Sequence, residues 1–103
     1  SGPNDEPAKI PKGFEFVEWK KDVGDPVKKG DPIATVKTPD GTIIPILAPE
    51  DGKVKSEEPL KPGDSLDGVP DDTIAVIEKP DGSPAPVKSP PGWTFKEWKK
   101  DVG

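Results

Sequence analysis

Short apolar runs separated by turn residues dominate this chain, and no stretch repeats its apolar residues with a helical period over three turns. The runs are rich in β-branched and aromatic residues, and clusters of Gly, Pro and Asp separate them, as is typical of strands and turns. The predicted strands are Phe14–Lys20, Ile33–Lys37, Thr42–Leu47, Lys53–Ser56 and Thr73–Glu78. Between two of them, Thr38-Pro39-Asp40-Gly41 predicts a hairpin turn, because its Gly tolerates a positive φ. The pattern therefore predicts an all-β domain.

Strict alternation along the first strand places Phe14, Phe16 and Glu18 on one face and Trp19 on the other. We interpret Trp19 as a core or sheet-edge anchor rather than a ligand platform. The composition agrees with a small β domain. The chain has 16 prolines and 11 glycines among 103 residues, with only 29% hydrophobic residues, a balance that could indicate disorder. These prolines and glycines instead stand between the strands as discrete turns.

The missing residue types exclude several kinds of chemistry. The chain has no His and no Cys, which removes zinc and haem sites, Cys nucleophiles and a histidine general base. Its formal net charge is -5, so we expect no nucleic-acid partner. No apolar run approaches the roughly 18–20 residues of a membrane span, so we expect no membrane insertion.

A duplication is the most informative feature. Pro11–Gly24 reads PKGFEFVEWKKDVG and Pro90–Gly103 reads PPGWTFKEWKKDVG, which gives ten identical positions of fourteen at an offset of 79 residues. Upstream, Pro7 also matches Pro86 and Lys9 matches Lys88 at the same offset. A period of this size describes whole small domains in tandem.

The duplication divides the chain into four parts. Residues 1–10 are a Pro-rich leader whose first three residues resemble the remnant of a cleaved tag, and residues 11–79 are one β domain. Residues 80–89 are predicted as a Pro-rich, semi-rigid linker. Residues 90–103 are the first strand of a following tandem repeat, which either docks on the preceding domain or remains flexible. Two copies of one strand also allow competition for a single position.

The domain itself contains a weaker repeat. Val27–Pro32 resembles Leu60–Ser65, and Thr35–Gly41 resembles Val76–Gly82. Each half has a Gly-Asp turn, a strand and a Pro-Asp-Gly turn. We therefore predict two half-domains related by a pseudo-twofold axis.

These motifs resemble the lipoyl/biotinyl domain family over about residues 13–79. Glu18–Val36 is similar to the first half of such domains, which has a Trp-containing strand, a Gly-Asp, a valine, a second Gly-Asp and an apolar strand. Ala48–Val54 resembles the Ala-Pro-x-x-Gly-x-Val of the second half, Lys61–Leu66 its last Gly-Asp turn, and Thr73–Ile77 its closing strand. The resemblance implies a small flattened barrel of two short sheets, the barrel-sandwich hybrid.

The resemblance also implies a carrier lysine at the tip of the central hairpin, where lipoate or biotin is attached. This chain has Thr38, Pro39, Asp40 and Gly41 at that tip. The nearest lysine is Lys37, which precedes the turn and which we interpret as a solvated strand-end residue rather than a modified one. The sequence therefore predicts no cofactor.

Acidic loops offer the other candidate site. Four carboxylates lie close together in sequence near Gly63 and Gly68, and oxygen-rich loops can bind calcium. These weak calcium candidates are Asp64, Asp67, Asp71 and Asp72. Their spacing differs from that of an EF-hand loop, so we expect solvated turn carboxylates and no metal. Paired-carboxylate catalysis requires a cleft that so small a barrel does not provide, and we expect no enzyme activity.

Two functions remain open. In the first, the chain is a non-catalytic structural or interaction repeat of a larger tandem-repeat protein, a surface or secreted spacer or adhesion stalk. Its partners would be neighbouring repeats of the same chain and possible contacts with another protein. In the second, it is a lipoyl- or biotinyl-type swinging-arm carrier of an acyl- or carboxyl-transfer complex, degenerate or modified at an atypical lysine. The first places the chain at the cell surface or outside the cell, and a cytoplasmic location is the alternative.

Overall fold

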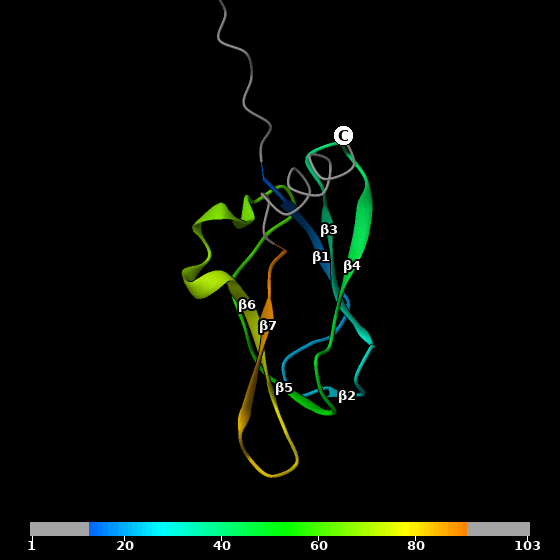
Figure 1. The fold of residues 1–103 in the computed structure, drawn as a ribbon, viewed down its shortest axis with the longest axis vertical. Coiled ribbons are helices and arrows are strands. Elements are labelled where there is room, and N and C mark those ends of the chain that lie inside the picture. The colour runs from blue at the N-terminus through cyan, green and yellow to red at the C-terminus, as the bar shows by residue number, and fades with distance from the viewer. Residues whose placement is uncertain (1–12, 91–103) are drawn as a thin grey trace, which may run out of the picture.

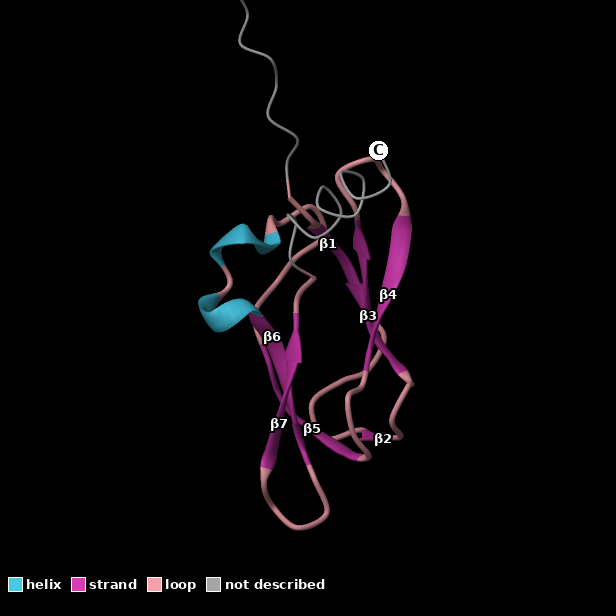
Figure 2. Cartoon of the chain, in the orientation of Figure 1, coloured by secondary structure: helices cyan, strands magenta, loops and turns pink. Residues whose placement is uncertain are grey.

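The structure is a computed structural model that describes residues 13–90, whose strands form two antiparallel sheets (Figure 1). A three-stranded sheet has the order β1-β3-β4, and a four-stranded sheet has the order β2-β5-β6-β7. The strands are β1 (Glu15–Trp19), β2 (Pro26–Val27), β3 (Pro32–Lys37), β4 (Ile43–Leu47), β5 (Gly52–Glu57), β6 (Thr73–Glu78) and β7 (Pro84–Lys88). Two short 3₁₀ turns, η2 (Leu66–Gly68) and η3 (Pro70–Asp72), lie between β5 and β6 (Figure 2).

The inward side chains of the two sheets form one hydrophobic core. Strands β3 and β6 each have a neighbour on both sides. Ile33 and Val36 of β3 and Ile74 and Ile77 of β6 are all fully buried. The five predicted strands each agree with an observed strand within one residue at either end. The predicted all-β class and the flattened barrel of two short sheets are confirmed.

A β-bulge in β1 changes the predicted orientation of its side chains. The register with β3 shifts between Phe16 and Glu18, so that alternation restarts after the bulge. Glu18 is therefore exposed, whereas Trp19 packs against the core, with 4.9 Å between the centroids of its ring and that of Phe16. The predicted faces, with Glu18 beside Phe16 and Trp19 on the opposite side, are wrong, but the interpretation of Trp19 as a core anchor is confirmed.

The two long hairpins have the same hydrogen bonds at their tips. The Thr38 N–H donates to the Thr42 carbonyl over 2.7 Å in the β3–β4 hairpin, and the Lys79 N–H donates to the Ser83 carbonyl over 2.9 Å in the β6–β7 hairpin. The tips point to opposite ends of the molecule (Figure 1). The hairpins are therefore equivalent under a pseudo-twofold axis, with an offset of 41 residues.

Two Gly-Asp turns form a second equivalent pair. In Asp22–Asp25 and in Lys61–Asp64, the last Asp carboxylate accepts a hydrogen bond from the first N–H over 2.8 and 2.9 Å respectively. The Gly N–H of the first turn donates to the carbonyl of Val54, and that of the second donates to the carbonyl of Phe16. Each turn thus binds the strand that begins the other half.

A third pair joins the start of each hairpin to its end. In Lys28–Asp31 and Val69–Asp72, the last N–H donates to the first carbonyl over 2.9 and 3.2 Å. The Asp31 carbonyl accepts from the N–H of Ala48, and the Asp72 carbonyl accepts from the N–H of Ser89. These residues also differ by 41 positions.

These bonds correct one half of the predicted internal repeat. The match of Thr35–Gly41 with Val76–Gly82 is confirmed, because their turns have the same bonds. The match of Val27–Pro32 with Leu60–Ser65 is wrong, since the two segments hold different places in the two halves. All Gly-Asp turns have the same local chemistry, so composition alone could not show which turn corresponds to which.

Part of the predicted linker 80–89 is a strand of the domain. Residues 84–88 form β7, which pairs with β6 from Thr73↔Lys88 to Glu78↔Pro84. Ala85 and Val87 are buried in the core. The linker prediction is therefore wrong for this segment, and the domain extends past residue 79. The predicted strand of the next repeat, residues 90–103, lies almost wholly outside the described residues, as does the leader 1–10.

Among residues 13–90, no helix is long and apolar enough to cross a membrane.

Candidate functional site at the β3–β4 hairpin

A carboxylate, rather than an amine, lies at the tip of the β3–β4 hairpin. The Thr38 hydroxyl and the Thr42 N–H both donate to the Asp40 carboxylate. These bonds favour the ionised form, and the bond from Thr38 has the largest effect in lowering the pKa of Asp40. Gly41 has a φ of 93°, which a tight turn of this kind requires. The tip is therefore a closed turn in which side chains bond the backbone.

The predicted alternative lysine lies one strand position before this turn. Lys37 ends β3 opposite Glu15 of β1, and its ammonium lies 4.0 Å from the Glu15 carboxylate. The Lys37 side chain is 47% exposed. Such an exposed pair contributes little to stability, so the amine is loosely held and open to solvent.

The equivalent β6–β7 tip has the same design. The N–H and the hydroxyl of Ser83 donate to the Asp81 carboxylate over 2.9 and 2.6 Å, and the side-chain bond is the main cause that lowers the pKa of Asp81. Both tips thus place an Asp second from last in the turn, as a cap for the backbone. The Asp40 carboxylate is therefore explained by turn chemistry, without a ligand.

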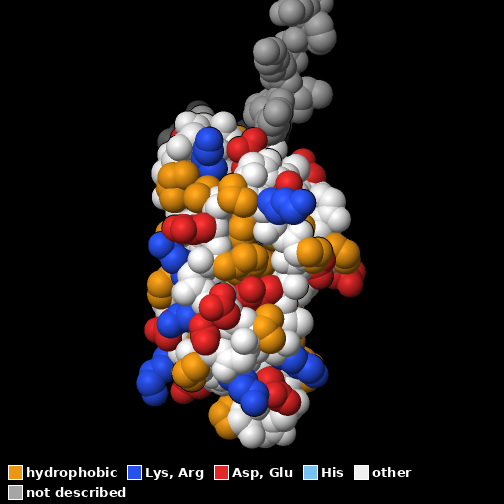
Figure 3. Space-filling view, turned by 180° about the vertical axis from the view of Figure 1, so that it is seen from behind, with side chains coloured by type: hydrophobic (Ala, Val, Ile, Leu, Met, Phe, Trp, Pro, Cys, Tyr) orange, Lys and Arg blue, Asp and Glu red, His pale blue; other side chains and the backbone are white. Residues whose placement is uncertain are grey.

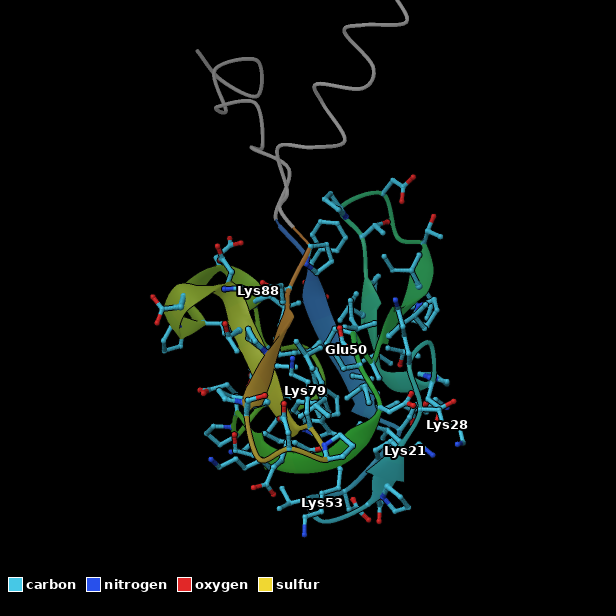
Figure 4. The ribbon with its side chains drawn as sticks, turned by 60° about the horizontal axis from the view of Figure 1, so that its bottom comes forward. Lys21, Lys28, Glu50, Lys53, Lys79 and Lys88 are labelled. Atoms are coloured by element: carbon cyan, nitrogen blue, oxygen red, sulfur yellow. The ribbon has the colours of Figure 1, made fainter. Side chains whose placement is uncertain are left out.

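Lysines near the second hairpin do not form a common site. Lys53, Lys79 and Lys88 lie at separate places along the second sheet (Figure 4). Two shallow surface hollows formed by residues 52–82 have volumes of about 370 and 410 Å³, and residues of the β3–β4 tip line neither of them. On the face shown in Figure 3, charges of both signs are interspersed with hydrophobic side chains.

The calcium candidates lie around η2 and η3 but do not converge. Asp64 accepts from the Lys61 N–H, and Asp71 and Asp72 adopt a positive φ of 52°. No group of three acidic side chains within residues 13–90 is arranged to hold a metal ion. Lys88 also donates through its ammonium to the Asp71 carbonyl over 2.9 Å, and this places a positive charge beside the loop.

Glu57 is the titratable residue that the sequence did not indicate. It lies at the end of β5 and one of its carboxylate oxygens is buried without a hydrogen-bond partner. Burial, followed by the nearby charges of Asp22 and Asp25, raises the pKa of Glu57 to about 7. In the strand registers Glu57 corresponds to Trp19, because Trp19 pairs with Ala34 and Glu57 pairs with the equivalent Ala75. Glu57 lines neither of the hollows described above.

The hydrophobic residues Ile43 and Leu47 are the other feature that sequence reasoning missed. They lie on the outer face of β4 and are 52% and 48% exposed. The sequence carried a signal, because the run IIPIL is apolar at consecutive positions and must therefore present apolar groups on both faces of a strand.

Comparison with protein families gives a match to the family described as "Biotin-requiring enzyme" over residues 6–77, which is more than half of the chain. A search of the curated proteins finds no match. The match covers both hairpin-forming halves up to β6 and agrees with the two sheets and the spaced Gly-Asp turns. The chain therefore belongs to the biotin/lipoyl domain family.

Proposed function

We propose that this domain is a non-catalytic structural and interaction module that retains the biotin/lipoyl fold without a covalent cofactor. The observation that supports it most strongly is the β3–β4 tip, where Asp40 stands at the place that the family resemblance gives to the modified lysine. Lipoate or biotin is attached through an amide bond, which requires a primary amine at that point. The residues present do not fit the group.

The turn chemistry explains why the fold persists without the lysine. Asp40 is held by Thr38 and Thr42, so that the tip closes through its own hydrogen bonds. The second tip is closed in the same manner by Asp81 and Ser83. A carboxylate at this point serves the backbone and leaves the barrel complete.

The repeated segment suggests how such a module would be used. A copy of the first strand follows at an offset of 79 residues. A chain of such units would be a spacer or adhesion stalk at the cell surface or outside the cell, with neighbouring repeats as its first partners. This assignment rests on the duplication and is a proposal about the longer protein.

A second function is favoured by family membership. The family match and the exposed amine of Lys37 are compatible with a swinging-arm carrier of an acyl- or carboxyl-transfer complex that is modified beside the tip. Lys37 is the lysine nearest the tip on β3, and its contact with Glu15 is loose.

Intact mass after co-expression with a lipoate ligase and a biotin ligase distinguishes the two functions. We expect the natural chain to be unmodified and Asp40→Lys, which places an amine at the tip, to gain one lipoyl or biotinyl group. Lys37→Arg is the matched control, since it keeps the charge and removes the alternative amine. Modification of the natural chain that disappears in Lys37→Arg would overturn the proposal in favour of the carrier.

A further inference from the structure

The place that β7 occupies beside β6 is the edge of the second sheet. β7 presents Ala85 and Val87 to the interior, and Ser89 follows directly after the strand; all three are buried. Pro86 lies opposite Val76. A weakly similar stretch, residues 5–10, lies 79 positions earlier in the chain, with Pro7 matching Pro86 and Lys9 matching Lys88. The chain therefore has two similar segments, residues 5–10 and 84–89, and a single position beside β6 for one of them.

The earlier segment matches β7 at two of its outward positions and is apolar at two inward ones, but it has Glu6 at the third inward position, where Ala85 is buried. Pro7 corresponds to Pro86 and Lys9 to Lys88, while Ala8 and Ile10 correspond to the buried Val87 and Ser89. Ala8 is smaller than Val87, whereas Ile10 is larger than Ser89. The total inward volume of these two positions is therefore similar.

The spacing between the earlier segment and β1 agrees with this correspondence. Ala48, the equivalent of Ser89, is followed four residues later by Gly52, which pairs with Val27. The residue in the other half that corresponds to Gly52 is Phe14, whose carbonyl accepts from Leu66, the equivalent of Val27. Ile10 precedes Phe14 by the same four residues. The two registers, one from the duplication and one from the pseudo-twofold axis, therefore agree that Ile10 corresponds to Ser89.

The family match supports the same assignment. It begins at residue 6, inside the earlier segment, and ends at residue 77, before β7. The family therefore counts the earlier segment as part of the domain, whereas the structure closes the domain with a strand from beyond the match.

We infer that the edge of β6 accepts either β7 or residues 5–10 of the same chain, and that the two exchange. When residues 5–10 close the domain, the segment 84–89 is released and becomes the opening strand of the unit that follows it. Consecutive repeats would thus be linked by a choice of strand, with no surface contact needed between finished domains. β7 has the advantages of a short hairpin turn and of Ala85, where residues 5–10 have Glu6. Residues 5–10 have Ile10 in place of Ser89, the one buried polar residue of the described core.

Cysteine pairs test the exchange directly, because the chain has no cysteine of its own. Val76 and Pro86 are directly opposite on antiparallel strands, at a separation that suits a disulfide. We expect Val76→Cys with Pro86→Cys to form a disulfide within the chain. We expect Val76→Cys with Pro7→Cys to form one in a minor fraction of molecules. Non-reducing electrophoresis and peptide mass mapping identify each bond.

Matched charge substitutions shift the balance between the two strands. Val87→Asp places a charge in the core through β7, and it should raise the yield of the disulfide between residues 7 and 76 several-fold while the chain stays folded by circular dichroism. Ala8→Asp should abolish that disulfide and leave stability unchanged. Both together should unfold the domain. Unfolding by Val87→Asp alone, or a disulfide between residues 7 and 76 found only between chains, would overturn the inference.

Discussion

The two halves of this barrel share their backbone and differ in their side chains. The first half, residues 14–48, and the second half, residues 52–89, have the same hydrogen bonds at their hairpin tips and Gly-Asp turns. At one equivalent place the first half has Gly30 with a φ of 92° and the second has Asp71 with a φ of 52°. The fold therefore depends on turn geometry that several residues can satisfy. The β3–β4 turn, for example, closes through Asp40 and needs no lysine.

The outer edges of the two hairpins show the contrast most plainly. In β4, Ile43, Pro45 and Leu47 alternate with the residues whose backbone groups bond to β3. Their own backbone groups therefore point toward the open edge of the sheet. At the equivalent places in β7 are Pro84, Pro86 and Lys88. Proline and lysine discourage a further strand from pairing, so the edge of β7 is better protected than that of β4. β4 keeps one proline and exposes two aliphatic side chains.

Removal of matched core side chains gives the largest expected effect. Ile33 and Ile74 are equivalent and both fully buried. Ile33→Ala and Ile74→Ala should each lower the free energy of unfolding by about 2–5 kcal/mol, because each leaves a cavity. Chemical denaturation followed by tryptophan fluorescence measures both. Equal losses with a single transition indicate one cooperative unit, and a biphasic curve for one variant alone would show that the halves unfold separately.

A glycine that begins the second half gives the next effect. Gly52 has a φ of 156°, and a Cβ built there would collide with the backbone carbonyl of Glu78. Gly52→Ala should lower the free energy of unfolding by about 3 kcal/mol, since the backbone must shift. Gly41→Ala is the control, because its Cβ would meet open space and only its φ of 93° opposes the change. If Gly41→Ala costs as much, the close approach at Gly52 is not the cause.

The sequence predicted the strands but not the closing strand, for a physical reason. The prolines at 84 and 86 are typical of a linker, and they are tolerated in β7 only because those positions face an open edge. Whether a strand lies at an edge is a property of the whole sheet, which local patterns do not contain. The β1 bulge was missed in the same way, since alternation after Phe16 depends on the register with β3.

The candidate site was predictable where turn chemistry alone determines it. Thr38, Asp40 and Gly41 predicted a tight turn, and the structure shows that turn. The raised pKa of Glu57 was not predictable, because it depends on burial beside Asp22 and Asp25, which are more than thirty positions away in the chain. The lack of convergence of the calcium candidates likewise depends on tertiary placement.

The pair Trp19 and Glu57 allows the comparison to be tested by pH. Both lie opposite an Ala of a central strand, but Trp19 packs on the core and Glu57 has a pKa raised to about 7, first by its burial. The folded state binds this proton more tightly than the unfolded state, in which the pKa of Glu57 is 4.5. The contribution of protonated Glu57 to the free energy of unfolding is therefore fully present below about pH 4.5 and is lost as the pH rises through about 7. Glu57→Gln should remove this dependence and raise the Tm at pH 8 by roughly a few degrees.

Thermal unfolding from pH 4 to pH 8, followed by circular dichroism, checks this expectation. Asp22→Asn is the matched control, since it should lower the pKa of Glu57 and weaken the dependence without removing it. A natural chain and a Glu57→Gln chain with parallel Tm curves would contradict the raised pKa.

The smallest expected effect comes from a position where the halves already differ by one polar group. The hydroxyl of Thr35 is buried without a hydrogen-bond partner, and the equivalent residue of the second half is Val76. Thr35→Val should therefore raise the free energy of unfolding by about 1 kcal/mol, because an unpaired buried hydroxyl is removed at constant shape. Val76→Thr is the reciprocal variant and should lower it where that hydroxyl also lacks a partner. Guanidinium denaturation of both variants against the natural chain measures the difference, and a loss of stability in Thr35→Val would mean that the hydroxyl is bonded in solution.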